Sequence, residues 1–436
     1  MINGTLRGRV AKVAAVGAAL AVGASALLVA TTGSAGADPK QQAALVGVGS
    51  DTIQDVMNAY AGENNGINYT PVQSSSATGQ RQIISFDATD PAGVDNCITT
   101  KVKAPTIYRA NGSGSGRNAL SRALLGGTFG LAGQCGGPKS VGGLIDFARS
   151  SSVGGTGTAL TYVPFGRDFV GLAYYYKDPV SGNPVNGNLS LTKAQITTLY
   201  STSTVSPATP LTLAGLGVTG GALGGFAGTT PVAPCGIQTG SGTYSFFNNT
   251  FLGGTTGSDQ NATSFCRLLA GGNVGTAAGG PGRLQESDGA ALKAKGDASP
   301  GTLVVIPYSS ANFIAQSNGV AKSQLGAGVD FVNFSDVVSN TAAQRLPYSG
   351  TAPNLSIVQT YYSSASGRDV FNVFDSGTFD PLFPSANQDV KTLFTTPGAG
   401  LCSTAAQNTR AAFGFGASVL PCGDTSTTSA AGTGTS

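Results

Sequence analysis

Two short loops rich in glycine and hydroxyl side chains have the composition needed to bind a small, oxygen-rich ligand. They are Gly112-Ser113-Gly114-Ser115-Gly116 and Gly240-Ser241-Gly242-Thr243. Each follows a stretch of β-forming residues and precedes a segment with helical spacing. Glycine lets backbone N–H groups turn toward one point, and a helix that starts behind such a loop presents unpaired N–H groups and partial positive charge. Because the loops lie far apart in the sequence, they predict two lobes that face one ligand.

Two further loops share this composition, Gly49-Ser50-Asp51-Thr52 and Arg149-Ser150-Ser151. The predicted ligand-binding residues of the four loops are Asp51, Thr52, Ser113, Ser115, Arg149, Ser150, Ser151, Ser241, Gly242 and Thr243. Arg149 could supply charge to an anion, or it could be a structural partner of Asp146 or Asp168. Asp51 could cap its helix, or it could face the ligand and disfavour a dianion. In so glycine-rich a chain, any one of these loops could also be an ordinary turn.

The composition excludes several classes of enzyme and metal protein. The chain has no histidine, so a Ser-His-Asp triad, a Cys-His pair and a two-histidine metal site are impossible. We therefore predict a protein that binds without catalysis, with no metal and no cofactor. A hydrolase that uses Ser113 or Ser241 as nucleophile is the enzymatic alternative, but no base for it is evident.

The six cysteines predict three disulfides in an exported protein. Six cysteines allow 15 connectivities, and the spacing favours neighbours along the chain. The favoured pairs are Cys97–Cys135, Cys235–Cys266 and Cys402–Cys422. Zinc is the competing interpretation, but a C-x-x-C pair is missing along with histidine.

Residues 1–37 have the features of a secretory signal peptide. Arg7, Arg9 and Lys12 precede an apolar run, and Ala35-Gly36-Ala37 forms a small-residue cleavage site. The run could also be a membrane anchor, but it is short and rich in glycine and alanine. No cysteine follows it directly, so a lipid anchor is not predicted. Without its three basic residues the exported chain has 21 residues of each charge, which gives no reason to expect a nucleic-acid partner.

Strands that alternate with helices predict an α/β fold with ligands at the carboxyl ends of strands. The expected strands are at 43–48, 102–108, 144–148, 169–176, 302–306 and 355–362. The expected helices are at 53–60, 117–125, 189–200, 244–252, 311–316, 370–374 and 390–394. Thr192 and Gln195 form a potential capping box, and the proline- and glycine-rich segment 203–235 is expected to be a long excursion.

With these elements in order, the chain resembles the phosphate-binding proteins of bacterial uptake systems, which have the type 2 periplasmic-binding-protein fold. The similarity covers most of the exported chain. The segments that carry it are Gly47-Val48-Gly49-Ser50-Asp51-Thr52, Gly112-Ser113-Gly114-Ser115-Gly116, Ile145-Asp146-Phe147-Ala148-Arg149-Ser150-Ser151, Leu191-Thr192-Lys193-Ala194-Gln195-Ile196, Gly240-Ser241-Gly242-Thr243 with Phe246-Phe247, and Ile306-Pro307-Tyr308 with Ala315-Gln316-Ser317-Asn318.

The resemblance implies two α/β lobes, joined by two crossover strands, that close on a ligand like a hinged clamp. It implies lobe I at 38–167 and 311–423, lobe II at 168–310, and a disordered tail at 424–436. Thr52, Ser113, Ser241, Gly242 and Thr243 would contact the ligand. This chain departs from the family at two positions, because Ile237 replaces its phosphate-binding arginine and Ser151 its anion-selecting aspartate.

Two functional hypotheses follow. The first is an exported, monomeric solute-binding protein that captures a small oxyanion, with phosphate first, for the membrane permease of an ABC transporter. Arg149 would then replace the missing arginine. The second is a secreted surface or cell-wall protein on the same fold that binds another ligand or partner, which the 203–235 segment and the lack of a lipid anchor favour.

Overall fold

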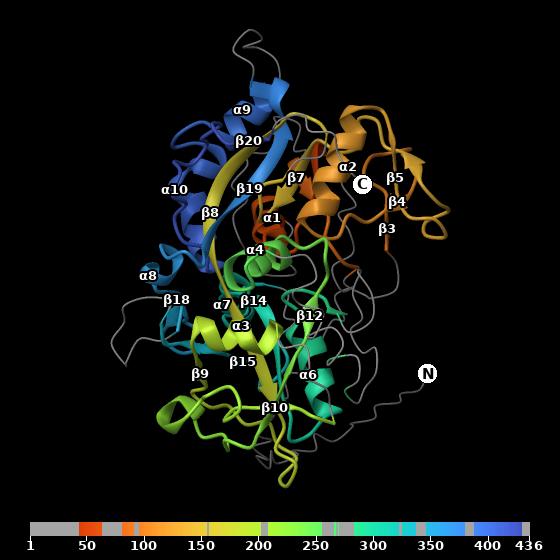
Figure 1. Cartoon of the computed structure of the whole chain (residues 1–436). Coiled ribbons are helices and arrows are strands. Elements are labelled where there is room, and N and C mark those ends of the chain that lie inside the picture. The colour runs from red at the N-terminus through yellow and green to blue at the C-terminus, as the bar shows by residue number, and fades with distance from the viewer. Residues whose placement is uncertain are drawn as a thin grey trace, which may run out of the picture.

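The structure is a computed structural model that describes residues 43–62, 81–90, 96–154, 157–201, 208–254, 266, 269, 283–321, 325–336, 346–379 and 388–429. The predicted signal peptide at 1–37 lies outside these residues. Among the helices described, none is long and apolar enough to cross a membrane. The chain forms two lobes, the upper and lower halves of Figure 1, which we call lobe I and lobe II.

Within the described residues, ten strands form a mixed sheet that passes through both lobes. Its order is β10-β11-β14-β8-β19-β7-β1-β2, with β15 and β20 also paired to β8. The strands of lobe I in this sheet are β1 (Ala43–Gly49), β2 (Arg81–Ser85), β7 (Phe147–Ser150) and β20 (Thr428–Ser429). Those of lobe II are β10 (Leu211–Thr212), β11 (Pro231–Pro234), β14 (Leu303–Ser309) and β15 (Asp330–Phe331).

Helices and short strand pairs cover the sheet in each lobe. Lobe I adds α1 (Gln54–Tyr60), β3 (Cys97–Ile98), β4 (Ile107–Tyr108), α2 (Ser113–Leu124), β5 (Thr128–Phe129), β6 (Lys139–Ser140), η2 (Ser376–Phe379), α9 (Gln388–Phe394), η3 (Gly400–Cys402) and α10 (Thr404–Ala412). Lobe II adds β9 (Ser190–Leu191), α3 (Lys193–Ser201), η1 (Gly220–Leu223), β12 (Gly236–Ile237), α4 (Gly242–Phe251), β13 (Arg283–Leu284), α6 (Gly289–Asp297), α7 (Ser310–Ser317), β16 (Asn333–Phe334), β17 (Tyr348–Ser349), β18 (Ser356–Ile357) and α8 (Gln359–Tyr362).

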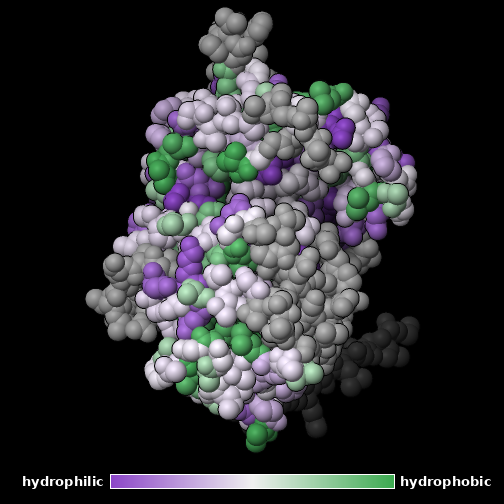
Figure 2. All heavy atoms as spheres, in the orientation of Figure 1, coloured by the Kyte–Doolittle hydropathy of each residue, from purple (hydrophilic) through white to green (hydrophobic). Residues whose placement is uncertain are grey.

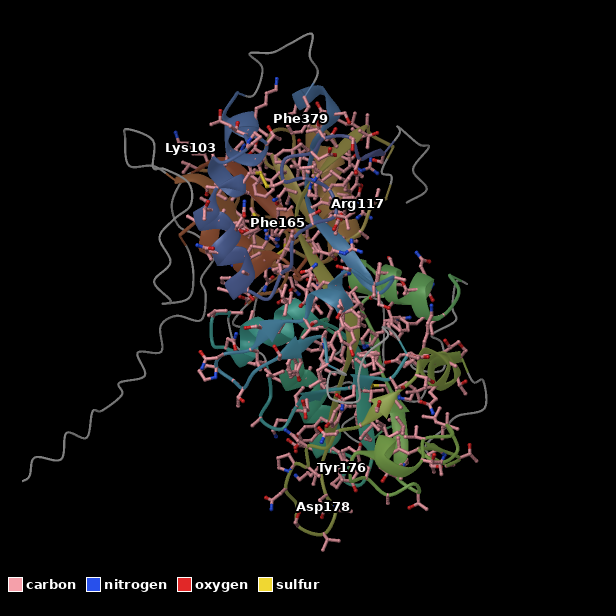
Figure 3. All side chains as sticks on the ribbon, turned by 90° about the vertical axis from the view of Figure 1, so that its left-hand side faces the viewer. Lys103, Arg117, Phe165, Tyr176, Asp178 and Phe379 are labelled. Carbon is pink, nitrogen blue, oxygen red and sulfur yellow. A yellow bond between two sulfur atoms is a disulfide. The ribbon has the colours of Figure 1, made fainter. Side chains whose placement is uncertain are left out.

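Two long antiparallel strands, β8 (Leu160–Tyr176) and β19 (Gly367–Asp375), connect the lobes. Side chains of β8 up to Phe165 pack in the cores of lobe I, and those from Phe169 onward pack in the core of lobe II. Figure 3 shows the result, with Phe165 in the upper lobe and Tyr176 near the tip of the lower one. The two-lobed α/β fold with two crossover strands is therefore confirmed.

Described residues well beyond 311 still pack in the core of lobe II. Phe331, Tyr348, Tyr361 and Tyr362 all pack in the core of lobe II, although α7 also contributes alanines to a core of lobe I. We therefore propose a boundary at Gly367, where β19 begins, in place of the expected one.

Several expected elements differ in the structure. The strand expected at 144–148 is β7, at Phe147–Ser150, and the helix expected at 189–200 begins only at Lys193, after the short strand β9. The apolar residues expected in a helix at 370–374 lie in strand β19, because β19 sits between β8 and β7 and is buried on both faces. A strand buried in this way carries a continuous apolar run, which spacing alone does not separate from a helix. The strand expected at 355–362 is only β18, followed by the helical turn α8. The strand expected at 102–108 is limited to β4, because a turn occupies 101–103.

The chain end is ordered further than expected. Residues 428–429 form β20 and pair with Leu160 and Thr161 of β8, so the expected disordered tail at 424–436 is wrong as far as Ser429. Such pairing uses only backbone groups, and a sequence of small polar residues gives no signal of it. Residues 430–436 lie outside the described part of the chain.

Other local predictions are confirmed. Thr192 and Gln195 form the capping box: the Gln195 side chain accepts from the Thr192 N–H at 2.9 Å, and the Thr192 hydroxyl accepts from the Gln195 N–H at 3.1 Å. The described part of the 203–235 excursion forms β10, η1 and β11. Its apolar residues Leu213, Leu216 and Phe226 join the core of lobe II.

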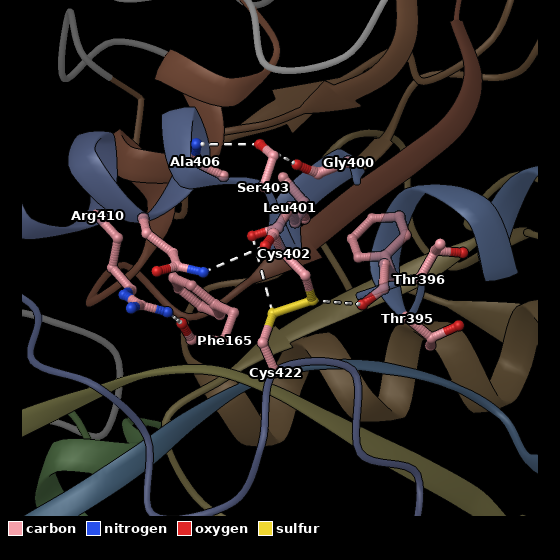
Figure 4. Close-up of a disulfide and its surroundings, with 12 residues drawn as sticks. Phe165, Thr395, Thr396, Gly400, Leu401, Cys402, Ser403, Ala406, Arg410 and Cys422 are labelled. Carbon is pink, nitrogen blue, oxygen red and sulfur yellow. Dashed lines mark hydrogen bonds between the residues drawn. A yellow bond between two sulfur atoms is a disulfide. The ribbon is translucent and has the colours of Figure 1, made fainter. Parts of the chain in front are cut away.

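The three disulfides join the cysteines that the spacing favoured, Cys97–Cys135, Cys235–Cys266 and Cys402–Cys422. Figure 4 shows the last of them, where the hydroxyl of Ser403 accepts from the N–H of Ala406 at the start of α10. Each closes a loop of 20 to 38 residues and stabilises the fold by about 3–4 kcal/mol in the chain-entropy model. The face drawn in Figure 2 mixes small hydrophobic patches with hydrophilic side chains.

Candidate functional site

The predicted hydroxyl-bearing loops meet where the two lobes touch. Within lobe I, the Ser151 hydroxyl lies 3.2 Å from the Ser50 and Ser113 hydroxyls and 3.4 Å from that of Thr52. The fifth member, Thr243, comes from α4 of lobe II, and its Oγ1 lies 3.4 Å from Thr52 Oγ1. All five are buried, and we call them the hydroxyl cluster.

The backbones of the two lobes also touch beside this cluster. The N–H of Gly114 donates to the carbonyl of Gly240 at 3.1 Å. A Cβ atom on Gly112 would lie 2.4 Å from the same carbonyl oxygen, and one on Gly242 would lie 2.3 Å from Ser151 Oγ. Glycine is therefore required at both positions for this close approach. Gly242 opens helix α4, whose N-cap Ser241 accepts a hydrogen bond from the N–H of Tyr244 at 3.0 Å.

The charge at the cluster comes from Arg368, which the sequence analysis missed. Its guanidinium donates to the hydroxyls of Thr243 at 2.6 Å and Thr52 at 3.3 Å, one in each lobe. It also reaches the carbonyl of Ser151 at 3.4 Å and lies 5.8 Å from the ring centre of Phe246. One buried cation therefore binds hydroxyls of both lobes.

Asp168 holds this arginine in position from the neighbouring crossover strand. Arg368 on β19 and Asp168 on β8 are direct cross-strand partners, and a guanidinium nitrogen lies 2.9 Å from Asp168 Oδ2. The other carboxylate oxygen accepts from Ser309 Oγ and from the N–H of Ala311 in the first turn of α7. Burial raises the pKa of Asp168, and the Arg368 guanidinium is the main influence that opposes the rise.

Arg149 lies outside the cluster, contrary to the role expected for it. It is fully buried, and its guanidinium donates to the carbonyls of Gly49 and Ser50, both at 3.0 Å, and to the hydroxyl of Ser85 at 2.7 Å. Burial lowers its pKa to about 10, so it stays charged at neutral pH. These contacts support the loop that carries Asp51 and Thr52, and none of the guanidinium hydrogen bonds found in the described structure goes to a hydroxyl of the cluster.

Two of the predicted ligand-binding serines, Ser150 and Ser115, make no hydrogen bond to the hydroxyl cluster in the described structure. Ser150 accepts from Arg117 at 2.7 Å and donates to the carbonyl of Ser152 at 2.6 Å, so its hydroxyl serves the lobe I scaffold. Ser115 lies half-buried in the first turn of α2, and no hydrogen bond joins its side chain to the cluster in the described structure. We therefore leave both out of the proposed site.

Acidic side chains border the cluster from both lobes. Asp51 Oδ2 accepts from Gln285 Nε2 at 2.8 Å, and the side-chain oxygen Oε1 of Gln285 accepts from Asn111 Nδ2 at 2.9 Å. Glu286, the next residue, accepts from the hydroxyl of Ser241. Burial raises the pKa of Asp51 well above its usual range, the negative charge of Glu286 raises it further, and Gln285 and Arg368 oppose the rise.

The two positions that depart from the resembled family have distinct surroundings. Ile237 is buried in β12 in the core of lobe II, and its carbonyl accepts from Arg283 at 2.8 Å. Ser151 belongs to the hydroxyl cluster itself. Among the described residues there is no group of three or more acidic or cysteine side chains that could hold a metal ion.

The fold and the site together define a two-lobed protein with a buried, mixed-charge polar site between its lobes. Solved structures similar to this chain include three bacterial proteins. One is described as a putative phosphate ABC transporter substrate-binding protein with bound phosphate from Clostridium perfringens, at 14% identity over 86% of this chain and 99% of that chain, with a TM-score of 0.42.

The second is a phosphate-binding protein from Stenotrophomonas maltophilia, at 14% identity over 86% of this chain and 91% of that chain, with a TM-score of 0.38. The third is an ABC-type phosphate transport receptor from Vibrio cholerae, at 13% identity, 86% and 99% coverage and a TM-score of 0.34. No protein-family model and no curated protein matches the sequence. Because the TM-scores lie below 0.5, we base the function on the geometry of the site.

Proposed function

We propose that this chain is an exported solute-binding protein that captures a small oxyanion, with phosphate as the first candidate, between its two lobes. The observation that carries this proposal is Arg368, a buried cation that donates to hydroxyls of both lobes at once. Delivery to the membrane permease of an ABC transporter is the role we propose for such capture. The three disulfides support export, because such bonds persist in oxidising compartments.

The hydroxyl cluster provides the donors that an oxyanion needs. On capture, Thr52, Ser113, Ser151 and Thr243 exchange the hydrogen bonds that they make with one another for bonds to the ligand. The proposed ligand contacts are therefore Thr52, Ser113, Ser151, Ser241, Gly242, Thr243 and Arg368. Hydrogen bonds to a charged partner contribute about 1.5–3 kcal/mol each, so a few of them suffice for micromolar affinity.

The acidic neighbours restrict the charge of the ligand. Asp168 neutralises much of the Arg368 charge, and Asp51 and Glu286 add negative potential close by. A dianion is disfavoured in this setting. Among phosphate species we therefore propose the monoanion, whose P–OH groups can also donate a hydrogen bond to a carboxylate.

Isothermal titration calorimetry of the chain without residues 1–37 tests this proposal with phosphate, sulfate and molybdate. We expect heat with phosphate, a large loss of affinity in Thr243→Val, and unchanged affinity in Thr128→Val, which removes an exposed hydroxyl of β5 that does not belong to the cluster. If none of the three anions gives heat at concentrations up to millimolar, the oxyanion proposal is wrong.

A surface or cell-wall binding protein is the second candidate. The observation that favours it is the 203–235 segment, which builds β10, η1 and β11 onto lobe II and buries Leu213 and Phe226 there. Pull-down on purified cell-wall polymer, with the wild type compared against a chain that lacks exposed parts of this segment, separates the two. Retention that depends on the segment, together with no anion binding, would favour this candidate.

A further inference from the structure

Two buried carboxyl groups, one from each lobe, face one another beside the hydroxyl cluster. Asp51 follows β1 in lobe I, and Glu286 precedes α6 in lobe II. Asp51 is 7% exposed and Glu286 is 0% exposed. Their two carboxyl groups lie within hydrogen-bonding reach of one another. The pair therefore exists only while the two lobes are in contact.

Each carboxyl has one oxygen that is satisfied and one that is not. Asp51 Oδ2 accepts from Gln285, and Glu286 Oε2 accepts from Ser241. Asp51 Oδ1 and Glu286 Oε1 are buried, and no donor among the described residues reaches either of them. A proton held between the two carboxyl groups would satisfy both oxygens at once.

The surroundings do not compensate two full negative charges. Arg368 on β19 is the cation that faces Asp51, and Asp168 on β8 already pairs with it. Arg149 on β7 is also close enough to interact with Asp51, but its hydrogen bonds go to Gly49, Ser50 and Ser85. From lobe II, Tyr308 on β14 adds a group that is neutral at neutral pH. Two carboxylates in contact in such a site retain one proton between them.

We propose that Asp51 is protonated when the lobes are closed and donates a hydrogen bond to the Glu286 carboxylate, so that closure takes up a proton. The proposal rests on the proposed function, because closure is the step that captures the ligand. In the open protein the Asp51 carboxyl meets water and has an ordinary acidic pKa, about 4. The closed form is therefore favoured at acid pH, and it loses this advantage as the pH rises through the raised pKa of Asp51.

The uptake of one proton on closure determines how steeply the equilibrium between closed and open molecules depends on pH. Between the two pKa values, the ratio of closed to open molecules falls up to tenfold for each unit of pH increase. The charged pair at higher pH repels across the interface between the lobes. In an acidified environment the binding protein would then close more readily than at alkaline pH.

Distance measurements between spin labels on the two lobes test the proposal without any ligand. Leu131 in lobe I and Val180 in lobe II are 51% and 94% exposed, and the six native cysteines are all in disulfides. Labels at Leu131→Cys and Val180→Cys therefore report the closed and open populations from pH 4.5 to 8.5. We expect the closed population of the wild type to fall as pH rises.

Glu286→Gln and Asp51→Asn each remove one charge of the pair while keeping its shape. We expect Asp51→Asn to stay closed across the range, with a slope near zero. We expect Glu286→Gln to lose pH dependence only in part, because burial still raises the pKa of Asp51. Asp297→Asn in lobe II keeps the wild-type slope. Asp297 pairs with Lys293 and Tyr175, outside the cluster. Small-angle X-ray scattering of the unlabelled proteins repeats the comparison without introduced cysteines.

Identical pH profiles for the wild type and both amide variants would overturn the proposal. So would a closed population that rises with pH in the wild type. Because no anion is present, this result is independent of phosphate calorimetry. If phosphate does not bind, the proposed function is wrong, but the spin-label distances still test whether closure depends on pH.

Discussion

Two buried arginines on neighbouring strands of one sheet have opposite surroundings. Arg149 on β7 donates to two backbone carbonyls and one serine, all within lobe I. Arg368 on β19 donates to a carboxylate and to hydroxyls from both lobes. Arg149 therefore holds one lobe in shape, whereas Arg368 links two lobes through groups that can also bind an anion.

The difference shows that burial and charge do not identify a ligand-binding arginine. Backbone carbonyls are acceptors that an anion cannot replace without breaking the loop they belong to. Hydroxyls can donate to an anion and still keep their positions. The type of partner, and whether it belongs to one lobe or two, separates a scaffold role from a binding role.

Arg368→Lys should give the largest effect on binding. Lysine keeps the positive charge beside Asp168 but has one nitrogen in place of three. In the arginine, Nε bonds Asp168 and Nη1 bonds the Ser151 carbonyl, while Nη2 reaches the hydroxyls of Thr52 and Thr243. The loss of about two charged hydrogen bonds, at roughly 1.5 kcal/mol each, lowers phosphate affinity about 100-fold. Calorimetry with phosphate measures the change.

Circular dichroism on the same variant shows whether the fold is retained, since the buried Asp168 still has a cation beside it. Phosphate affinity within about threefold of the wild type would contradict the distinction between the two arginines. Arg368→Met is the harsher change, because it leaves the Asp168 charge buried without compensation, at a cost of roughly 3–5 kcal/mol of stability.

Arg149→Met should act on stability and leave binding nearly unchanged. The carbonyls of Gly49 and Ser50 lose their guanidinium donors in a fully buried setting. Each unsatisfied group costs about 1–3 kcal/mol, so we expect the free energy of unfolding to fall by roughly 2–4 kcal/mol. Urea unfolding measures this loss, and calorimetry below the unfolding transition measures phosphate affinity in the folded protein.

Arg368→Lys and Arg149→Met distinguish the roles of the two arginines best when phosphate binding is measured for both under the same conditions. A loss of binding in folded Arg149→Met that matches the loss in Arg368→Lys would restore Arg149 as a ligand residue. That outcome would also mean that the loop holding Asp51 and Thr52 moves on capture.

The loops that form the site were predicted from the sequence, whereas the charged residue at its centre, Arg368, was not. A glycine and serine loop between a strand and a helix is a local feature, and the spacing of residues 112–116 and 240–243 is visible in the chain itself. The disulfides were also accessible, because each joins cysteines that follow one another along the chain. The capping box of α3 is local in the same sense.

Arg368 was not predictable in this way, because its role depends on residues distant in sequence. Asp168 and Arg368 become partners only through the antiparallel pairing of β8 with β19, across 200 residues. A usable signal was present nonetheless: Arg368 lies at the start of an apolar run that is buried on both faces, where an unpaired charge is too costly. Treating that run as a helix removed the reason to ask what the arginine pairs with.

A smaller prediction concerns the glycine contact that brings the two hydroxyl-bearing loops together. In Gly112→Ala the added methyl group would lie 2.4 Å from the carbonyl oxygen of Gly240, and residue 112 has a φ of 91°. The lobes must then separate slightly beside the cluster. We expect phosphate affinity to fall about tenfold, which corresponds to roughly 1.4 kcal/mol.

Gly126→Ala is the matched control, because Gly126 also has a positive φ, 67°, but its added methyl group meets nothing within 4 Å. Residue 112 has a ψ of 166° with its φ of 91°, a region essentially restricted to glycine, so Gly112→Ala carries a backbone strain of roughly 1–3 kcal/mol. Urea unfolding measures the loss of stability in each variant, and binding is compared in the folded proteins. Only Gly112→Ala should weaken phosphate binding and shift the labels toward the open form. If the two alanine variants bind phosphate equally well, contact between the loops at Gly240 does not limit capture, and the arginine that spans the lobes must hold them together without it.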